Sequence, residues 1–281
     1  MDFGLALGRL NPAVYLEVTR EADRLGFESV WLPEHLVLPR KMSRSPRPGE
    51  THPPVPPEIP VFDAFTYLGF LAGATERIRL ATHVYNIGLR HPFVAARAVQ
   101  TLDLVSGGRA IFGVGASWLE EEWIAAQLDF STRGRRVDEC IEVCKRLWSE
   151  HEVAHHGEFF SFDTVLFEPK PIQKPWPPIL VGGESPAALR RAAASGDGWV
   201  GITHTVESVA PQIETLRNLL AEQGRTLDGF EIVLGGPVES PADAQRWSEL
   251  GVTRLIVSPW RRSAEAIAGL REFAERFGLS A

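Results

Sequence analysis

Eight short apolar runs, each followed by a segment of helical character, recur along the chain and constrain its fold more than any other feature. The runs span residues 3–7, 29–33, 77–84, 109–115, 178–183, 198–202, 230–236 and 253–259. They show little alternation of apolar and polar residues, which is typical of parallel strands that are buried on both faces. Strands that alternate with helices favour an α/β architecture.

The segments between the runs carry helix start and stop signals. Residues 11–26 begin with Asn and Pro and end with Gly, while residues 185–196 and 207–224 also end at Gly. Eight strand–helix units in 281 residues predict a single (β/α)8 TIM barrel over residues 1–281. A doubly wound sheet is the alternative, but it does not naturally use eight such units. We see no domain boundary.

Two segments interrupt this alternation and are predicted to be insertions. Residues 39–60, after the second strand, hold eight prolines in 22 positions and cannot form a helix or a central strand. Loops after barrel strands lie over the active-site face, so this segment is a candidate lid, with a stiff loop of no role as the alternative. Residues 151–177, before the fifth strand, contain an alternating pattern that predicts a small hairpin.

Composition narrows the class of partner. The net charge of −7 argues against nucleic acid or an anionic membrane as a general partner. Cys140 and Cys144 are spaced for one helix face, but no second ligand pair completes a metal site, so we expect buried, reduced thiols and no metal. We find no signal peptide or membrane-spanning run and expect a cytoplasmic protein.

The strand ends carry glycines that point to a ligand. Gly113 and Gly115 end the fourth strand, but the third glycine of a dinucleotide-binding fingerprint is replaced by Trp118, so a Rossmann site is excluded. In a barrel, these glycines would leave room for a flat ligand against the backbone. The segment from Gly182 to Pro186 ends a strand and begins a helix, and its free N–H groups predict an anion site, most simply for a phosphate. A tight turn is the alternative for the Gly182–Gly183 pair.

An ordered set of motifs resembles the luciferase-like flavin and deazaflavin oxidoreductases over nearly the whole chain. The motifs are GFESVWLPEHL at residues 26–36, the block at residues 75–123, RGRRVDECIEVCKRLWSE at 133–150, FEPKPIQKPWPPILVGG at 167–183 and ASGDGWVG at 194–201. The residues of these motifs resemble the branch that uses the deazaflavin coenzyme F420 more than they resemble the FMN-dependent monooxygenases.

The resemblance implies where the chemistry lies. His35, with Glu34 before it, corresponds to the family's histidine beside the reactive ring and would move the proton that accompanies hydride transfer. The His83–Val84 bond falls where the family keeps a cis peptide. The expected coenzyme-binding residues are His35, Thr82, His83, Val84, Asn86, Gly115, Ala116, Ser117, Gly182, Gly183, Glu184 and Ser185.

Two tryptophans are expected in the substrate pocket, Trp118 and Trp199. Relatives that oxidise sugar phosphates have a catalytic glutamate where this chain has Trp118, which argues against glucose 6-phosphate and favours a flatter, more apolar substrate. Packing of Trp118 on the barrel rim is the alternative. We also expect the lid cations Arg40, Lys41, Arg44 and Arg47 to steer an anionic group, with solvated loop charges as the alternative.

Three functions are compatible with these residues. The leading one is hydride transfer between coenzyme F420 and an organic small molecule; the second is an FMN-dependent monooxygenase that uses reduced flavin and O2. A non-catalytic flavin-binding protein is the third, and His35 argues against it because such a protein needs no proton donor there. We expect a homodimer.

Overall fold

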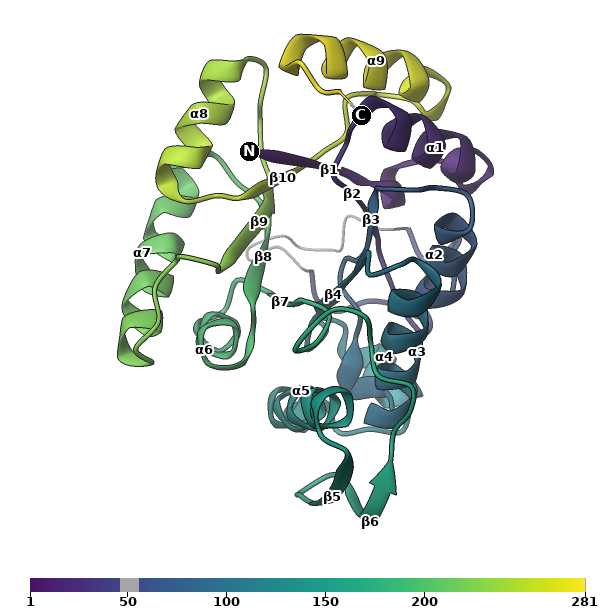
Figure 1. The fold of residues 1–281 in the computed structure, drawn as a ribbon, viewed down its shortest axis with the longest axis vertical. Coiled ribbons are helices and arrows are strands. Elements are labelled where there is room, and N and C mark those ends of the chain that lie inside the picture. Colours follow the sequence, from purple (N-terminus) through teal and green to yellow (C-terminus); the bar gives the residue numbers. More distant parts are fainter. Residues whose placement is uncertain (46–55, 281) are drawn as a thin grey trace.

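Eight parallel strands form a closed barrel in the computed structural model, which describes residues 1–45 and 56–280 (Figure 1). The barrel strands are β1 (Asp2–Ala6), β2 (Ser29–Leu32), β3 (Arg79–Thr82), β4 (Ala110–Val114), β7 (Ile179–Gly182), β8 (Gly198–Thr203), β9 (Glu231–Gly235) and β10 (Arg254–Val257). Each predicted apolar run overlaps one of these strands, and the bounds differ by at most two residues. The predicted TIM barrel is therefore confirmed.

Neighbouring strands in the barrel follow the order of the chain. The order is β1-β10-β9-β8-β7-β4-β3-β2, and β1 also pairs with β2 to close the ring. β4 pairs directly with β7 because β5 (Glu152–His156) and β6 (Ser161–Leu166) form a separate antiparallel hairpin. All eight carboxyl ends consequently face one side of the barrel, which is where a site is expected in this fold.

Helices surround the barrel on the outside (Figure 1). They are α1 (Tyr15–Leu25), α2 (Ala64–Ala72), α3 (Pro92–Val105), α4 (Glu120–Ala125), α5 (Arg133–Ser149), α6 (Pro186–Ser195), α7 (Val206–Glu222), α8 (Pro241–Leu250) and α9 (Ala266–Phe277). Short 3-10 helices are η1 (Leu7–Arg9), η2 (Pro12–Val14), η3 (Ile87–Leu89), η4 (Phe130–Thr132) and η5 (Ser263–Glu265).

The observed helix caps lie close to the positions that the sequence predicts. Asn11 caps η2, accepting a hydrogen bond from the Ala13 N–H at 3.0 Å, and α1 follows directly. α1 ends at Gly26, whose φ of 86° is a left-handed conformation that favours glycine. Ser185 caps α6 through the Ala188 N–H, so the strand-to-helix turn at Gly182–Ser185 is built as expected.

The strands are buried on both faces because two cores share them. One core fills the barrel interior with Trp31, Ala81, Ile111, Leu180, Val200, Val233 and Ile256. The other lies between the barrel and the helices and contains Cys140 and Cys144 of α5. Both cysteines are buried free thiols, as predicted, and burial raises the pKa of Cys140 to about 12.

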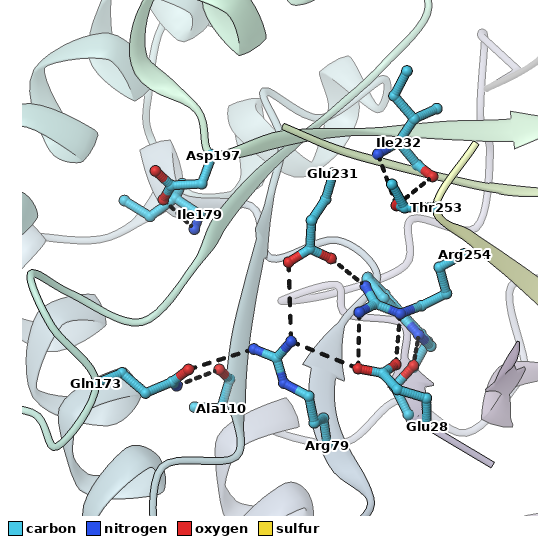
Figure 2. Close-up of polar contacts among 12 residues, drawn as sticks. Glu28, Arg79, Ala110, Gln173, Ile179, Asp197, Glu231, Ile232, Thr253 and Arg254 are labelled. Atoms are coloured by element: carbon cyan, nitrogen blue, oxygen red, sulfur yellow. Dashed lines mark hydrogen bonds and ion pairs between the residues drawn. The ribbon is translucent and has the colours of Figure 1, made fainter. Parts of the chain in front are cut away.

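A cluster of charged side chains closes the barrel at the amino ends of its strands (Figure 2). Arg254 lies between Glu28 and Glu231, with Nε 2.5 Å from Glu28 Oε2 and Nη1 2.6 Å from Glu231 Oε2. Arg79 approaches the same carboxylates at 3.6 and 3.9 Å. Burial by itself lowers the pKa of Arg254, but the two carboxylates outweigh it and hold the pKa above its usual value. These ion pairs connect the amino ends of β2, β3, β9 and β10, so we assign a structural role to this end of the barrel.

Two additions extend the barrel. The β5–β6 hairpin lies beside α5 (Figure 1), where the Glu139 carboxylate accepts hydrogen bonds from the Phe159 and Phe160 N–H groups and contacts His155 at 3.0 Å. The segment between β2 and α2 contains the predicted lid; residues 46–55 of that segment, which include Arg47, lie outside the described residues.

Candidate active site

A cavity of about 470 Å³ opens at the carboxyl ends of β2, β3, β4, β7 and β8. Most of the residues that the sequence singled out line it together: Glu34, His35, His83, Val84, Asn86, Gly115, Ala116, Ser117, Trp118, Gly182, Gly183, Glu184 and Ser185. These residues come from four different strand ends. The fold therefore brings them to one place.

Two expected site residues lie outside this cavity. The Thr82 side chain is fully buried, and its Oγ1 donates a hydrogen bond to the Gly113 carbonyl at 2.7 Å. Trp199 is also fully buried, with Nε1 donating to the Gly183 carbonyl at 2.8 Å. Both side chains support the cavity wall from behind, and neither lines the cavity.

The cavity floor contains a cis peptide bond between His83 and Val84, at the position that the family resemblance implied. The glycines of the neighbouring strands accommodate this segment. A Cβ on Gly115 would lie 2.6 Å from Val84 Cγ2, one on Gly182 would lie 2.9 Å from Val84 Cγ1, and one on Gly113 would lie 2.0 Å from the Thr82 carbonyl oxygen. The sequence alone suggested room for a ligand at the glycine pair. The structure gives a different reason for these glycines. Thr82, at the end of β3, and Val84, just after it, fill the space that side chains at these positions would need.

Glu34 is held by an ion pair inside the cavity wall. Its Oε1 lies 2.6 Å from Arg90 Nη2, and its Oε2 accepts the Asn86 N–H at 3.0 Å. The Arg90 guanidinium also stacks over the Tyr85 ring, 4.3 Å from its centroid. The Glu34 carboxylate thus ties the loop after β2 to the loop after β3.

His35 faces the cavity beside two partners. Its Nδ1 lies 3.0 Å from Oε2 of Glu122, a residue of α4. Its ring stands edge to face with Trp118, with the centroids 5.8 Å apart. Trp118 therefore forms the cavity wall next to His35, and its place in a substrate pocket stays a prediction.

The turn between β7 and α6 forms the far wall. Gly183 has a φ of 122°, and a Cβ there would approach the Ala188 Cβ to 3.0 Å. Ser185 Oγ accepts the Ala188 N–H at 3.2 Å. Glu184 is turned toward β8, where it accepts the Ile202 N–H at 2.7 Å and contacts His204 at 3.1 Å. Ser185 and Ala188, at the start of α6, line the cavity.

Three arginines line the cavity: Arg44, Arg133 and Arg191. Arg133 stacks over Phe130, 3.9 Å from the ring centroid, and burial together with Arg44 and Arg191 lowers its pKa. Arg191 forms an ion pair with Asp138. The helix start and these cations make this wall suitable for an anion.

The described part of the predicted lid contacts α4. Arg44 pairs with Glu120 at 2.8 Å and lines the cavity, while the Ser43 N–H donates to Glu121 at 2.8 Å. Arg40 and Lys41 are exposed. The charge of Arg44 is thus partly balanced by the protein, and the steering role proposed for the four lid cations stays a prediction.

A second cavity of about 710 Å³ adjoins the first and shares His83, Gly201 and Ile202 with it. It extends toward the ends of β9 and β10. Burial and, secondarily, Arg9 lower the pKa of His83 to about 4, so this histidine is neutral at physiological pH. The two cavities thus lie side by side at the carboxyl end of the barrel.

Four cavity-side residues are not singled out by the sequence: Arg90, Glu122, Arg133 and Arg191. Glu122 follows two other glutamates at a helix start, where acids are common for electrostatic reasons. Arg133 and Arg191 belong to ordinary amphipathic helix patterns, and Arg90 lies in the short connection between η3 and α3. Only the tertiary contacts distinguish them.

The residues that the structure describes contain no group of three or more His, Cys, Asp or Glu side chains arranged to hold a metal ion. Over the same residues, no helix is both long and apolar enough to cross a membrane.

The barrel and the cavity at its carboxyl end define a class of enzyme that comparison with known proteins specifies further. The model of the luciferase-like monooxygenase family matches residues 6–250, and the chain belongs to this family. An uncharacterised protein of Mycobacterium tuberculosis is 31% identical over 279 residues, covering 97% of this chain and 96% of the relative.

Relatives with assigned activities use two kinds of coenzyme. An FMNH2-dependent dimethylsulfone monooxygenase of Pseudomonas putida is 31% identical over 160 residues, covering 56% of this chain and 44% of that protein. The structure of an F420-dependent secondary alcohol dehydrogenase, bound to an F420–acetone adduct, superposes with a TM-score of 0.77 at 17% identity, covering 98% and 97% of the two chains. At that identity the superposition shows the shared fold alone.

Proposed function

We propose that this chain is an oxidoreductase that transfers a hydride between coenzyme F420 and an organic small molecule. The observation that carries the proposal is that one cavity contains both a histidine able to move a proton and a wall suited to an anion. His35 provides the first, and the α6 start with Arg133 and Arg191 provides the second.

The residues present fit such a coenzyme. Val84 and the glycines packed against it form the cavity floor, and Gly115, Gly182 and Val84 all line the cavity. The turn at Gly182–Ser185 and the positive end of the α6 helix dipole would hold the coenzyme's phosphate. Arg133 and Arg191 would attract the acidic tail that extends from it. When bound, the coenzyme supplies a carbon that accepts or gives a hydride.

His35 would handle the accompanying proton. Its Nδ1 is engaged by Glu122, so Nε2 is the ring nitrogen available to the cavity. A hydroxyl of the substrate would hydrogen-bond to Nε2 and pass its proton there as the hydride leaves the neighbouring carbon. Trp118 would form an apolar wall that excludes water from this position.

An FMN-dependent monooxygenase that uses reduced flavin and O2 is the second candidate. The similarity to the FMNH2-dependent dimethylsulfone monooxygenase favours it. Both ring systems are flat and both coenzymes carry a phosphate, so the same floor and the same helix start suit either. They differ in the tail, which in F420 carries further negative charge that Arg133 would attract.

Coenzyme titration tests the proposal. Purified protein is titrated with F420 and, separately, with FMN, following the fluorescence of each coenzyme. We expect F420 to bind at least about tenfold more tightly, which corresponds to about 1.4 kcal/mol. Arg133→Gln should weaken F420 binding more at low salt than at high salt. Arg246→Gln, which removes a surface charge paired with Glu207, is the control and should leave binding unchanged. Tighter binding of FMN would support the monooxygenase instead, and binding of neither would overturn both.

The role of His35 is tested once a panel of small alcohols has identified one that reduces the coenzyme. His35→Ala should lower the rate of reduction at saturating coenzyme by about 10²- to 10⁴-fold, the usual contribution of a general acid or base. Saturation removes any defect in binding from this measurement. Reduction at the wild-type rate would show that His35 is only part of the wall.

A further inference from the structure

Glu122 is the most completely buried carboxylate beside the candidate site. Its side chain is 0% exposed, and its two oxygens are surrounded by hydrogen-bond donors. Oε1 accepts the Leu36 N–H at 2.6 Å, and Oε2 lies 3.0 Å from His35 Nδ1. Asn86 Nδ2 and Ser117 Oγ approach Oε2 at 3.5 and 3.4 Å.

Helix formation does not explain this burial. Glu120 and Glu121 are on the same first turn of α4 and contact the lid segment near the surface, through Arg44 and Ser43. Their positions satisfy the preference for acids at a helix start. Burying a third carboxylate costs several kcal/mol unless its hydrogen bonds are complete. The contacts of Glu122, and not its position at a helix start, therefore explain why a carboxylate is buried here.

The contact with His35 decides which ring nitrogen carries the proton. The other partners of Glu122 are all donors, so its oxygens act as acceptors and the neutral His35 ring must donate from Nδ1. Nε2 is then the unprotonated nitrogen, and the described residues offer it no hydrogen-bond partner. It belongs to a side chain that lines the cavity.

We propose that Glu122 is the positioning residue of His35: it holds the imidazole as the Nδ1–H tautomer, with Nε2 presented to the cavity as a proton acceptor. This inference rests on the proposed function and deepens it, because an acceptor at Nε2 suits a substrate that brings a hydroxyl. The O–H bond of that substrate breaks and its proton goes to Nε2. The neighbouring carbon would give its hydride to the coenzyme, when bound, and become a carbonyl carbon. The Glu122 carboxylate, 3.0 Å from Nδ1, stabilises the imidazolium produced.

The tautomer of His35 can be measured without substrate or coenzyme. Protein labelled with ¹⁵N-histidine is studied by NMR at pH 8, where an ordinary histidine is neutral. His35 is assigned from the signal lost in His35→Gln. We expect a protonated Nδ1 and an unprotonated Nε2 in the wild type. Glu122→Gln keeps the size of the side chain but adds an amide that can donate to Nδ1, so the Nε2–H tautomer should gain at least about half of the population.

Matched variants separate positioning from general damage. Glu121→Gln removes a charge on the same helical turn without touching His35, and it should keep the wild-type tautomer. Glu122→Asp keeps the carboxylate and should retain more of the Nδ1–H form than Glu122→Gln. If Glu122→Gln does not fold, the wild type and Glu122→Asp still decide the question. A wild-type His35 protonated at Nε2, or the same tautomer in the wild type and Glu122→Gln, would overturn the proposal.

The outcome is distinguishable from that of the proposed function. F420 titration of the same samples should give affinities for the wild type and Glu122→Gln within about threefold of each other, because the carboxylate contacts the histidine and not the coenzyme. A protein with the Nδ1–H tautomer that binds no coenzyme would refute the proposed function and leave the Glu122–His35 pair in place. Tight coenzyme binding with an unchanged tautomer in Glu122→Gln would do the reverse.

Discussion

Replacing Arg254 with methionine should destabilise the barrel by about 3 kcal/mol. The Arg254 side chain is 3% exposed and pairs with both Glu28 and Glu231 (Figure 2). Methionine keeps most of the apolar stem but leaves two carboxylates without their main partner. Breaking a buried ion pair in this way costs about 3 to 5 kcal/mol. The lower value applies because the two carboxylates are 23% exposed and Arg79 remains at 3.6 and 3.9 Å.

Chemical and thermal unfolding measure this loss. For 281 residues, an unfolding entropy of about 2.1 cal/mol/K per residue converts 3 kcal/mol into a fall in Tm of about 5 °C. The matched control is Arg246→Gln, whose ion pair with Glu207 has side chains 57% and 71% exposed. It should cost no more than about 0.5 kcal/mol. Coenzyme binding should be unchanged in both variants, since the cluster lies at the opposite end of the barrel from the cavity. Equal losses in the two variants would refute the reasoning from burial.

Three further predictions concern the site and the assembly. His83 has a folded-state pKa of about 4 against about 6.5 when unfolded, so the unfolded chain binds its proton first and stability falls as the pH drops from 6.5 toward 4. Urea unfolding at pH 7 and pH 5 should show His83→Gln losing about 1 to 2 kcal/mol less than the wild type, and equal losses would assign the pH dependence to other groups. Gly183→Val, at a φ of 122°, should weaken F420 binding at least about tenfold in titration while circular dichroism shows a folded barrel; unchanged affinity would remove the α6 turn from the phosphate site. The expected homodimer should appear by light scattering, and Phe70→Glu, at an exposed apolar residue of α2, should shift it toward monomer if that helix is in the interface; a monomeric wild type would contradict the homodimer.

The sequence by itself determined the architecture and the location of the candidate site. Continuous apolar runs and helix caps are local signals, because they depend on residues within a few positions of one another. They were sufficient to predict the eight barrel strands and the turn at Gly182–Ser185. The shared direction of parallel strands then brings their carboxyl ends together without further information.

The tertiary structure alone decided the partners within the site. His35 and Glu122 are 87 positions apart, and Glu34 and Arg90 are 56 apart, so no local pattern could pair them. The role of Gly113 and Gly115 also changed, since only packing reveals that the β3 segment takes the room that their missing side chains leave. Helical periodicity places Glu122 on a helix start but cannot say which neighbour it meets. That depends on how separate elements pack, because a buried carboxylate must find its donors wherever the fold brings them.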